Sequence, residues 1–150
     1  MALGDIIKTL HYEVVYGRKG TGTLVAGRSV SVDASGDFIP STTTTLGVHG
    51  MYTGLTEVRG AVTYYQILIE GYGAGEMGGA VKPNNGIKSD ANGKFIVAST
   101  TVTATYVQGE TQELWKVSGR YLRLRSDNQF NPSDAADTSE GVIKVGRGVA

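Results

Sequence analysis

The sequence predicts an all-β fold: a compact β-barrel-like or sandwich domain of short antiparallel strands, with an extended arm at the N-terminus. Glycine contributes 22 of the 150 residues, about double its usual share, and it separates short runs rich in Thr, Val, Ile and Tyr. Residues of these types favour strands, whereas glycine favours tight turns. The turn signals recur about every 8–12 residues, which is the spacing of a sandwich or barrel.

Four segments carry the clearest strand patterns. Val62–Glu70 is a continuous apolar run between glycines and predicts a central strand. Thr101–Val107 alternates threonine with Val, Ala and Tyr, which predicts one side facing the core and one facing water. Leu114–Arg125 and Val142–Val145 predict a further strand and a short closing strand. Shorter apolar segments complete the set: around Leu24, Val30–Val32, Phe38-Ile39, Leu46–Val48 and Phe95–Ala98.

The first residues carry a competing helical pattern. Four apolar residues follow the spacing of an amphipathic helix: Leu3, Ile6, Ile7 and Leu10. The segment is short and has no capping residue, so an isolated helix would be marginal. We therefore expect residues 1–20 to form an arm that is mobile or becomes ordered on a partner, followed by a β-domain over residues 21–150. The alternative that Leu10–Tyr16 is the first strand of the sheet stays open.

A seven-residue phrase occurs twice in the chain. Asp33–Ile39 (DASGDFI) reappears 57 residues later as Asp90–Ile96 (DANGKFI). Asp and Asn side chains stabilise tight turns, glycine adopts positive φ, and Phe-Ile restarts a strand, so each copy predicts a β-hairpin. In the second copy, Asn92-Gly93 predicts a type I′ turn. Two ordinary turns that arose independently are the alternative explanation. A calcium loop is disfavoured because each copy has too few carboxylates.

Charge and cysteine content argue against several classes of partner. Lys plus Arg and Asp plus Glu number 14 each, whereas a nucleic-acid-binding protein needs excess positive charge to neutralise phosphates. The chain has no cysteine, and therefore no disulfide framework and no thiolate site. No apolar run approaches the ~20 residues of a membrane span, and charged residues interrupt the N-terminus where a signal peptide needs an apolar run. We expect no nucleic-acid partner, no membrane partner and no export by that route.

No combination of residues predicts catalysis or a cofactor. The two histidines, His11 and His49, lie in neither a metal-binding spacing nor a nucleophile motif. Glu70 and Glu76 form a nominal carboxylate pair of the kind that glycosidases use, but the glycines of Gly71–Gly79 predict a loop that fixes no geometry. We therefore expect a protein that is not an enzyme, with no catalytic residue, no cofactor and no metal site.

A basic cluster with interleaved aromatic residues lies in the last third of the chain: Trp115, Lys116, Arg120, Tyr121, Arg123 and Arg125. A nucleic-acid-binding stripe with stacking aromatics is one interpretation, but the zero net charge argues against it. Strand-edge charges that discourage aggregation are the favoured interpretation, with acidic residues of the following polar loop as candidate partners across a subunit interface. Trp115 is expected to anchor the core or an interface.

Two segments resemble a known phage family. Ala26–Gly36 (AGRSVSVDASG) and Val81–Ile96 (VKPNNGIKSDANGKFI) look like the strand–turn–strand phrases of small capsid decoration, or cement, proteins of tailed phages whose domain is described as a β-tulip. The resemblance covers roughly residues 24–105 and leaves out the arm and Asp127–Gly141. It implies a compact β-barrel-like domain with an extended arm that binds as a trimer to the outside of the phage head.

The resemblance implies a structural protein of the virion, and the zero formal net charge is compatible with assembly. We expect a decoration protein that binds the outer capsid surface of a tailed-phage head and bridges subunits of the major capsid protein as a homotrimer. The expected capsid contacts are the apolar side chains of the arm: Leu3, Ile6, Ile7 and Leu10. The alternative is a carbohydrate-binding or adhesin module of a phage tail fibre or cell surface. That alternative needs exposed aromatic rings, and the candidates are Tyr52, Tyr64, Tyr65 and Tyr72.

Overall fold

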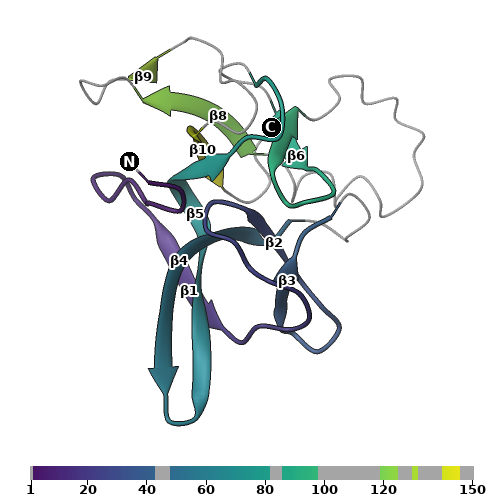
Figure 1. The fold of residues 1–150 in the computed structure, drawn as a ribbon. Helices are drawn as coiled ribbons and strands as arrows, with labels where there is room; N and C mark the ends of the chain where they lie inside the picture. Colours follow the sequence, from purple (N-terminus) through teal and green to yellow (C-terminus); the bar gives the residue numbers. More distant parts are fainter. Residues whose placement is uncertain are drawn as a thin grey trace, which may run out of the picture.

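A computed structural model describes residues 2–42, 48–81, 86–97, 119–124, 130–131 and 140–145. Within these residues the fold is all-β, as the composition predicts, and its strands pair antiparallel (Figure 1). The strands are β1 (Glu13–Gly17), β2 (Ser29–Val32), β3 (Phe38–Pro40), β4 (Gly50–Arg59), β5 (Val62–Glu76), β6 (Gly86–Ser89), β7 (Phe95–Val97), β8 (Gly119–Leu124), β9 (Phe130–Asn131) and β10 (Glu140–Val145). They pair in the order β3-β2-β4-β5-β10-β8-β6-β7, with β1 on β5 and β9 on β8. No pairing between the described residues closes this sheet into a barrel.

Most of the predicted strands that fall on described residues are present. The segments around Val30–Val32, Phe38 and Phe95 lie in β2, β3 and β7. The closing strand predicted at Val142–Val145 is the greater part of β10, and β8 lies within the predicted Leu114–Arg125. Leu24 is buried but lies outside the strands. The alternating segment Thr101–Val107 lies outside the described residues.

The central strand β5 is longer than predicted. Its first half is the apolar run predicted as a strand, but it continues to Glu76 through glycines that predicted a loop. The glycines alternate along the strand, so one side of it has no side chains and other groups fill the space. A Cβ on Gly73 would lie 2.7 Å from Cε of Met51, and one on Gly75 would lie 2.9 Å from Cδ2 of Phe95. The prediction of a loop was wrong over residues 71–76, because the glycines there make room for neighbouring side chains and do not turn the chain.

The N-terminal segment lies along β5. The amide of Gly4 donates to the carbonyl oxygen of Ala74 at 2.8 Å, and that of Ile7 donates to Tyr72 at 2.9 Å. Further along, β1 pairs with the first half of β5. At residues 4–7 and 13–17 the segment predicted as an arm is therefore hydrogen-bonded to the chain's own sheet. A strand is present where the alternative placed one, as β1 over Glu13–Gly17. Residues 2–20 contain no helix. Pairing with β5 provides partners for backbone amides and carbonyls that a short, marginal helix would have to pair within itself.

Both copies of the repeated phrase form the predicted hairpins, β2–β3 and β6–β7, with the same hydrogen bonds. In the first copy, Asp33 Oδ1 accepts from the amides of Ser35 and Asp37 at 2.9 and 3.0 Å. In the second, Asp90 Oδ1 accepts from Asn92 and Lys94 at 2.8 and 2.9 Å. The two aspartates thus hold the two loops in one conformation.

The turn type of the second hairpin differs from the prediction. The amide of Gly93 donates to the carbonyl oxygen of Asp90 at 3.2 Å, so the central residues of the turn are Ala91 and Asn92, and Gly93 follows them with φ +81°. The type I′ turn predicted on Asn92-Gly93 is wrong because the side chain of Asp90 accepts the amides of Asn92 and Lys94, which stabilises a wider loop.

The likeness of the hairpins extends to the strands around them. Before each hairpin, a glycine amide donates to the carbonyl oxygen of the hairpin's phenylalanine: Gly20 to Phe38 at 2.8 Å and Gly78 to Phe95 at 2.9 Å. β2 pairs with β4 as β6 pairs with β8, and β4 pairs with β5 as β8 pairs with β10. β1 pairs with the first half of β5 as the second half of β5 pairs with β10.

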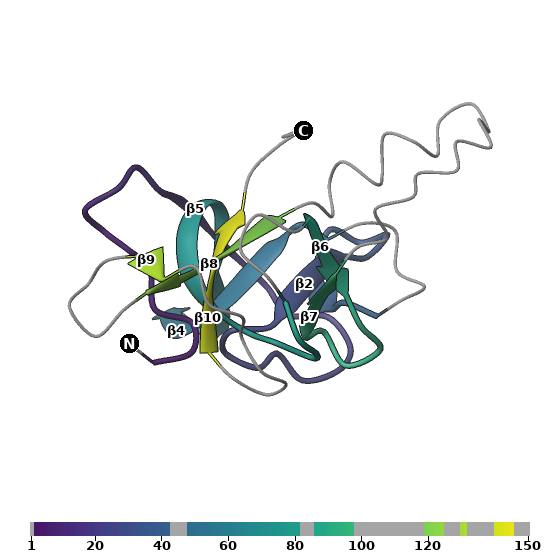
Figure 2. The same cartoon turned by 90° about the horizontal axis from the view of Figure 1, so that it is seen from above.

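The sheet therefore consists of two copies of one five-stranded unit. The first unit contains β1, β2, β3, β4 and residues 62–70 of β5; the second contains residues 71–76 of β5, then β6, β7, β8 and β10. Figure 2 shows β2 beside the β6–β7 hairpin, where Ser29 Oγ donates to the carbonyl oxygen of Gly93 at 2.9 Å. The two units are thus joined both by the shared strand and by contacts between their hairpins.

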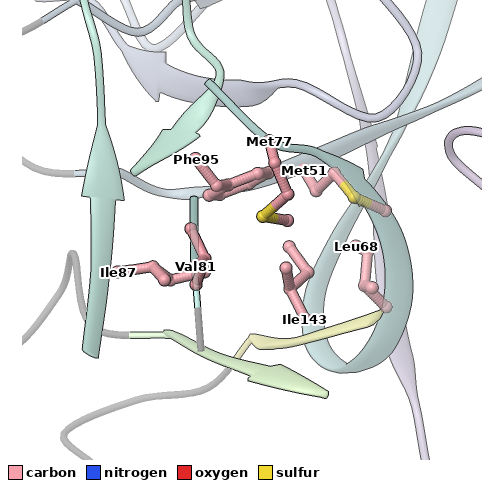
Figure 3. Close-up of a cluster of buried hydrophobic side chains, with 7 residues drawn as sticks. All are labelled: Met51, Leu68, Met77, Val81, Ile87, Phe95 and Ile143. Carbon is pink, nitrogen blue, oxygen red and sulfur yellow. The ribbon is translucent and has the colours of Figure 1, made fainter. Parts of the chain in front are cut away.

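Two apolar clusters form the core, and each is centred on one unit. The first consists of Leu24, Val30, Phe38, Tyr52 and Ile67. The second consists of Met51, Leu68, Met77, Val81, Ile87, Phe95 and Ile143, whose side chains converge in Figure 3. Phe38 and Phe95 hold equivalent places in the two clusters, as do Ile67 and Ile143. The repeated phrase thus supplies the aromatic anchor of each core.

Candidate partner-binding surface

The β4–β5 hairpin, residues 54–65, projects away from the rest of the sheet (Figure 1). On the β2 side of β4, backbone pairing ends at Tyr52, which exchanges hydrogen bonds with Gly27 and Arg28. Within the described chain, no strand pairs with the outer edge of β4 beyond that residue. Three apolar side chains of the hairpin are exposed: Leu55 at 58%, Val58 at 68% and Val62 at 38%. Exposed apolar residues on a projecting, unpaired hairpin are typical of a surface that another protein covers.

Arg59 makes several contacts on one side of this hairpin. Its guanidinium donates two hydrogen bonds to the carboxylate of Glu57, at 3.1 and 3.0 Å. The same group lies over the rings of Tyr16 and Tyr64, 5.7 and 5.3 Å from their centroids. The hydrogen bonds from Arg59 hold the pKa of Glu57 below its ordinary value. Because Tyr16 belongs to β1, the cation–π contact connects the hairpin to the N-terminal segment.

The N-terminal segment adds three more exposed apolar side chains, Leu10, Tyr12 and Tyr16. Tyr16 contacts the hairpin through Arg59, whereas Tyr12 lies at the other end of β1, against Gly71 of β5. The exposed large hydrophobic residues of the described chain number eight, and six of them belong to this segment or to the hairpin. We refer to these six, Leu10, Tyr12, Tyr16, Leu55, Val58 and Val62, as the hairpin–β1 surface. β1 and β4 pair with opposite edges of β5, so their own outer edges lie on the two opposite sides of this part of the sheet.

Of the four residues predicted to contact the capsid, three are at least partly buried within the chain itself. Leu3 packs against Gly27, where an added Cβ would lie 2.9 Å from Cβ of Leu3. Ile6 packs against the second core cluster, and Ile7 is half-buried. Leu10 is the fourth, and it is exposed. The contact of residues 4–7 with β5 explains their apolar character without a partner.

Sequence reasoning did not identify the hairpin's apolar residues. Leu55 and Val58 lie between Gly54 and Gly60, inside β4, which no sequence pattern predicted. Only the other strand of the hairpin was predicted, as the apolar run Val62–Glu70 in β5. The available signal was an apolar residue on each side of a two-residue turn, which predicts a hairpin but not that the hairpin leaves the sheet. Its exposure follows from the strand order, which no local pattern contains.

Two side chains that the sequence analysis considered for catalysis, Glu76 and His49, contact other side chains of the fold. The carboxylate of Glu76 accepts from Nε of Arg28 at 2.8 Å and lies 3.4 Å from Nζ of Lys94. The hydrogen bond from Arg28, with a further contribution from Lys94, holds the pKa of Glu76 below its ordinary value. Such a carboxylate stays ionised and is a poor general acid. His49 packs beside the ring of Phe38, with centroids 6.1 Å apart.

The tyrosines considered for carbohydrate binding are not all at the surface. Tyr52 is buried in the first core cluster and packs against Tyr65, with ring centroids 5.5 Å apart. Burial raises the pKa of Tyr52 above its ordinary value. Tyr64 lies in the contact with Arg59. Of the basic cluster, Arg120, Tyr121 and Arg123 fall within β8; Trp115, Lys116 and Arg125 lie outside the described residues.

The chain matches no protein-family model, no curated protein and no solved structure. The described residues contain no helix that is long and apolar enough to cross a lipid bilayer. Any inference about function therefore depends on the fold, on the hairpin–β1 surface and on the sequence resemblance.

Proposed function

We propose that this chain is a structural decoration, or cement, protein that binds the outer surface of a tailed-phage head and bridges subunits of the major capsid protein as a homotrimer. The observation that carries the proposal is the concentration of exposed apolar residues on the hairpin–β1 surface. A projecting hairpin with a free edge contacts a neighbouring subunit without a preformed pocket, either by side-chain packing or by strand addition.

The remaining features support the same function. The zero formal charge allows many copies to lie close together without mutual repulsion. A cement protein needs only moderate affinity at each contact, because several contacts made at once raise the overall affinity. The hairpin projects from the two five-stranded units, which share one sheet. The predicted contact Leu10 is retained as part of this surface.

The first test is the native mass of the purified protein over a concentration series, followed by co-sedimentation with expanded phage heads that lack the protein. We expect a trimer of three 15.8 kDa chains, in solution or on the head, and saturable binding at a fixed ratio to the coat subunit. Failure to co-sediment with the heads at any protein concentration would exclude the proposal.

A carbohydrate-binding or adhesin module is the second candidate, and the exposed ring of Tyr16 beside Tyr64 is the observation that favours it. Aromatic rings at a surface stack on sugar rings through their apolar faces. A glycan array distinguishes the two functions. Reproducible glycan binding that Tyr64→Ala abolishes would favour the adhesin module, whereas head binding without glycan binding favours the decoration protein.

A further inference from the structure

Three potential metal ligands meet where the N-terminal segment reaches the middle of β5: His11, Glu13 and Glu70. One ligand atom from each lies within 4.8 Å of the others, and Nε2 of His11 is 3.9 Å from Oε1 of Glu13. All three side chains are exposed. Sequence spacing did not predict this group, because Glu70 is 57 residues away from Glu13 and joins it only through strand pairing.

A β-bulge brings the two glutamates opposite each other. Val14 pairs with Leu68, but Glu13 pairs with Glu70, so Ile69 is passed over. The second unit is an internal reference, since its equivalent pairing of β5 with β10 runs through Tyr72–Lys144 and Gly71–Val145 with no such shift. Bulges re-aim side chains and are over-represented beside functional sites.

Gly71 makes room for the histidine. A Cβ at this position would lie 3.0 Å from the carbonyl oxygen of His11 and 2.9 Å from Cβ of Tyr12, and Gly71 has φ +121°. The close approach of residues 11–12 to β5 therefore requires glycine here. The bulge and this glycine together bring the three donors together: His11 from the segment before β1, Glu13 from β1 and Glu70 from β5.

The charges of this group are unbalanced. Like charges directly opposite each other on paired strands are destabilising, and Glu13 and Glu70 form no ion pair with a lysine or arginine of the described chain. Other glutamates do have such partners: Glu57 has Arg59, and Glu76 has Arg28 and Lys94. A bound cation would remove the repulsion at Glu13 and Glu70.

We propose that His11, Glu13 and Glu70 bind a divalent transition-metal ion of the zinc type. One imidazole and two carboxylates are donors that zinc accepts, in a tetrahedral arrangement completed by water. Calcium and magnesium prefer oxygen donors only and, for calcium, more of them. Metal–ligand bonds of about 2.0–2.2 Å require the exposed side chains to close in slightly, which their freedom at the surface permits. The ion clamps the N-terminal segment onto β5.

The test uses full-length protein freed of metal with a chelator that is then removed. Titration with Zn²⁺ by calorimetry, and with Co²⁺ by visible absorption, should show one saturable site per chain and a rise in the unfolding temperature. His11→Ala and Glu70→Gln should each weaken Zn²⁺ binding by at least about tenfold. Glu57→Gln, which changes an exposed glutamate outside the group, is the matched control and should bind as the parent does.

The metal site is independent of the proposed function, because zinc binding and phage-head binding are measured in separate experiments. Circular dichroism of His11→Ala and Glu70→Gln should show the parent fold, because both side chains are exposed. Displacement of Zn²⁺ by millimolar Ca²⁺ or Mg²⁺, binding that does not saturate, or equal binding by the parent and the two variants would mean an adventitious ion only and would overturn the proposal.

Discussion

Glu76 holds the position in the second unit that Arg18 holds in the first, and both form an ion pair across the base of their hairpin. Glu76 lies 3.4 Å from Nζ of Lys94, and Arg18 lies 3.4 Å, Nε to Oδ1, from Asp37. The two pairs have opposite polarity. Glu76 alone has a second cation, because Arg28 of the first unit reaches it at 2.8 Å. This carboxylate therefore links the two units.

We expect Glu76→Gln to lower the free energy of unfolding by about 1–3 kcal/mol. The carboxylate side chain is only 12% exposed, and its removal leaves the partly buried cations of Arg28 and Lys94 without their counter-ion. Urea unfolding of the parent and the variant measures the difference. Asp37→Asn is the comparison, because Arg18 is 62% exposed and returns to water. A larger loss of stability in Asp37→Asn than in Glu76→Gln would contradict the conclusion that Glu76 links the two units.

The same carboxylate should make stability depend on acid. Its pKa in the folded protein lies below the ordinary value of 4.5, so it contributes stability that is fully present above that value and is lost as the pH falls through the lowered pKa. Unfolding temperatures of the parent should fall on acidification below about pH 4.5. Glu76→Gln should show a shallower fall over the same range. Parallel pH profiles for the two proteins would exclude Glu76 as a source of the dependence.

Two glycines test the duplication of the fold. A Cβ on Gly75 would lie 2.9 Å from the ring of Phe95, and one on Gly17 would overlap the ring of Phe38. Gly17→Ala and Gly75→Ala should each destabilise the protein by about 1–3 kcal/mol, because each buried ring must shift. Gly79→Ala is the matched control, since its Cβ would lie 3.9 Å from the nearest side-chain atom, Cγ2 of Ile96. Thermal unfolding of the three variants gives the comparison. A neutral result at Gly17 or Gly75 would argue against this packing.

The hairpin aspartates should contribute alike to the two units. Asp33 and Asp90 each accept two backbone amides through Oδ1. Replacement of either by alanine leaves those amides without an acceptor and should cost about 0.5–1.5 kcal/mol. Replacement by asparagine keeps an oxygen acceptor and should restore most of the loss. Chemical denaturation measures both series. If the asparagine variants are no more stable than the alanine variants, the aspartates do not stabilise the hairpins by accepting these amide hydrogen bonds.

Part of this architecture could be predicted from the sequence, and part could not. The repeated DASGDFI phrase identified both hairpins, because turn chemistry and an apolar anchor are local properties. The strands that complete the two units share no such phrase. Pairing, not composition, makes β1 equivalent to the second half of β5. The glycine-rich end of β5 was interpreted as a loop. A glycine that allows a close neighbour and a glycine that forms a turn look the same in the sequence.

The candidate surface was the part least accessible to sequence reasoning. Leu3, Ile6 and Ile7 are apolar because they pack on the chain's own sheet, and a periodic pattern does not distinguish that role from contact with a partner. Leu55 and Val58 are exposed because their hairpin extends beyond the neighbouring strands of the sheet. The group formed by His11, Glu13 and Glu70 depends on a bulge, which shifts the register by one residue and has no signature here.

The hairpin–β1 surface gives the sharpest test of partner binding. Leu55→Ser with Val58→Ser removes two exposed apolar side chains, so the unfolding temperature should stay close to that of the parent. The same double variant should bind phage heads at least about tenfold more weakly, since burial of each of these side chains is worth about 1.5–3 kcal/mol. Val25→Ser with Val32→Ser is the matched control, because these valines are exposed outside the hairpin and β1. Co-sedimentation measures all three proteins. Equal loss of binding in both double variants would mean that general surface hydrophobicity, and not this hairpin, attaches the protein to the head.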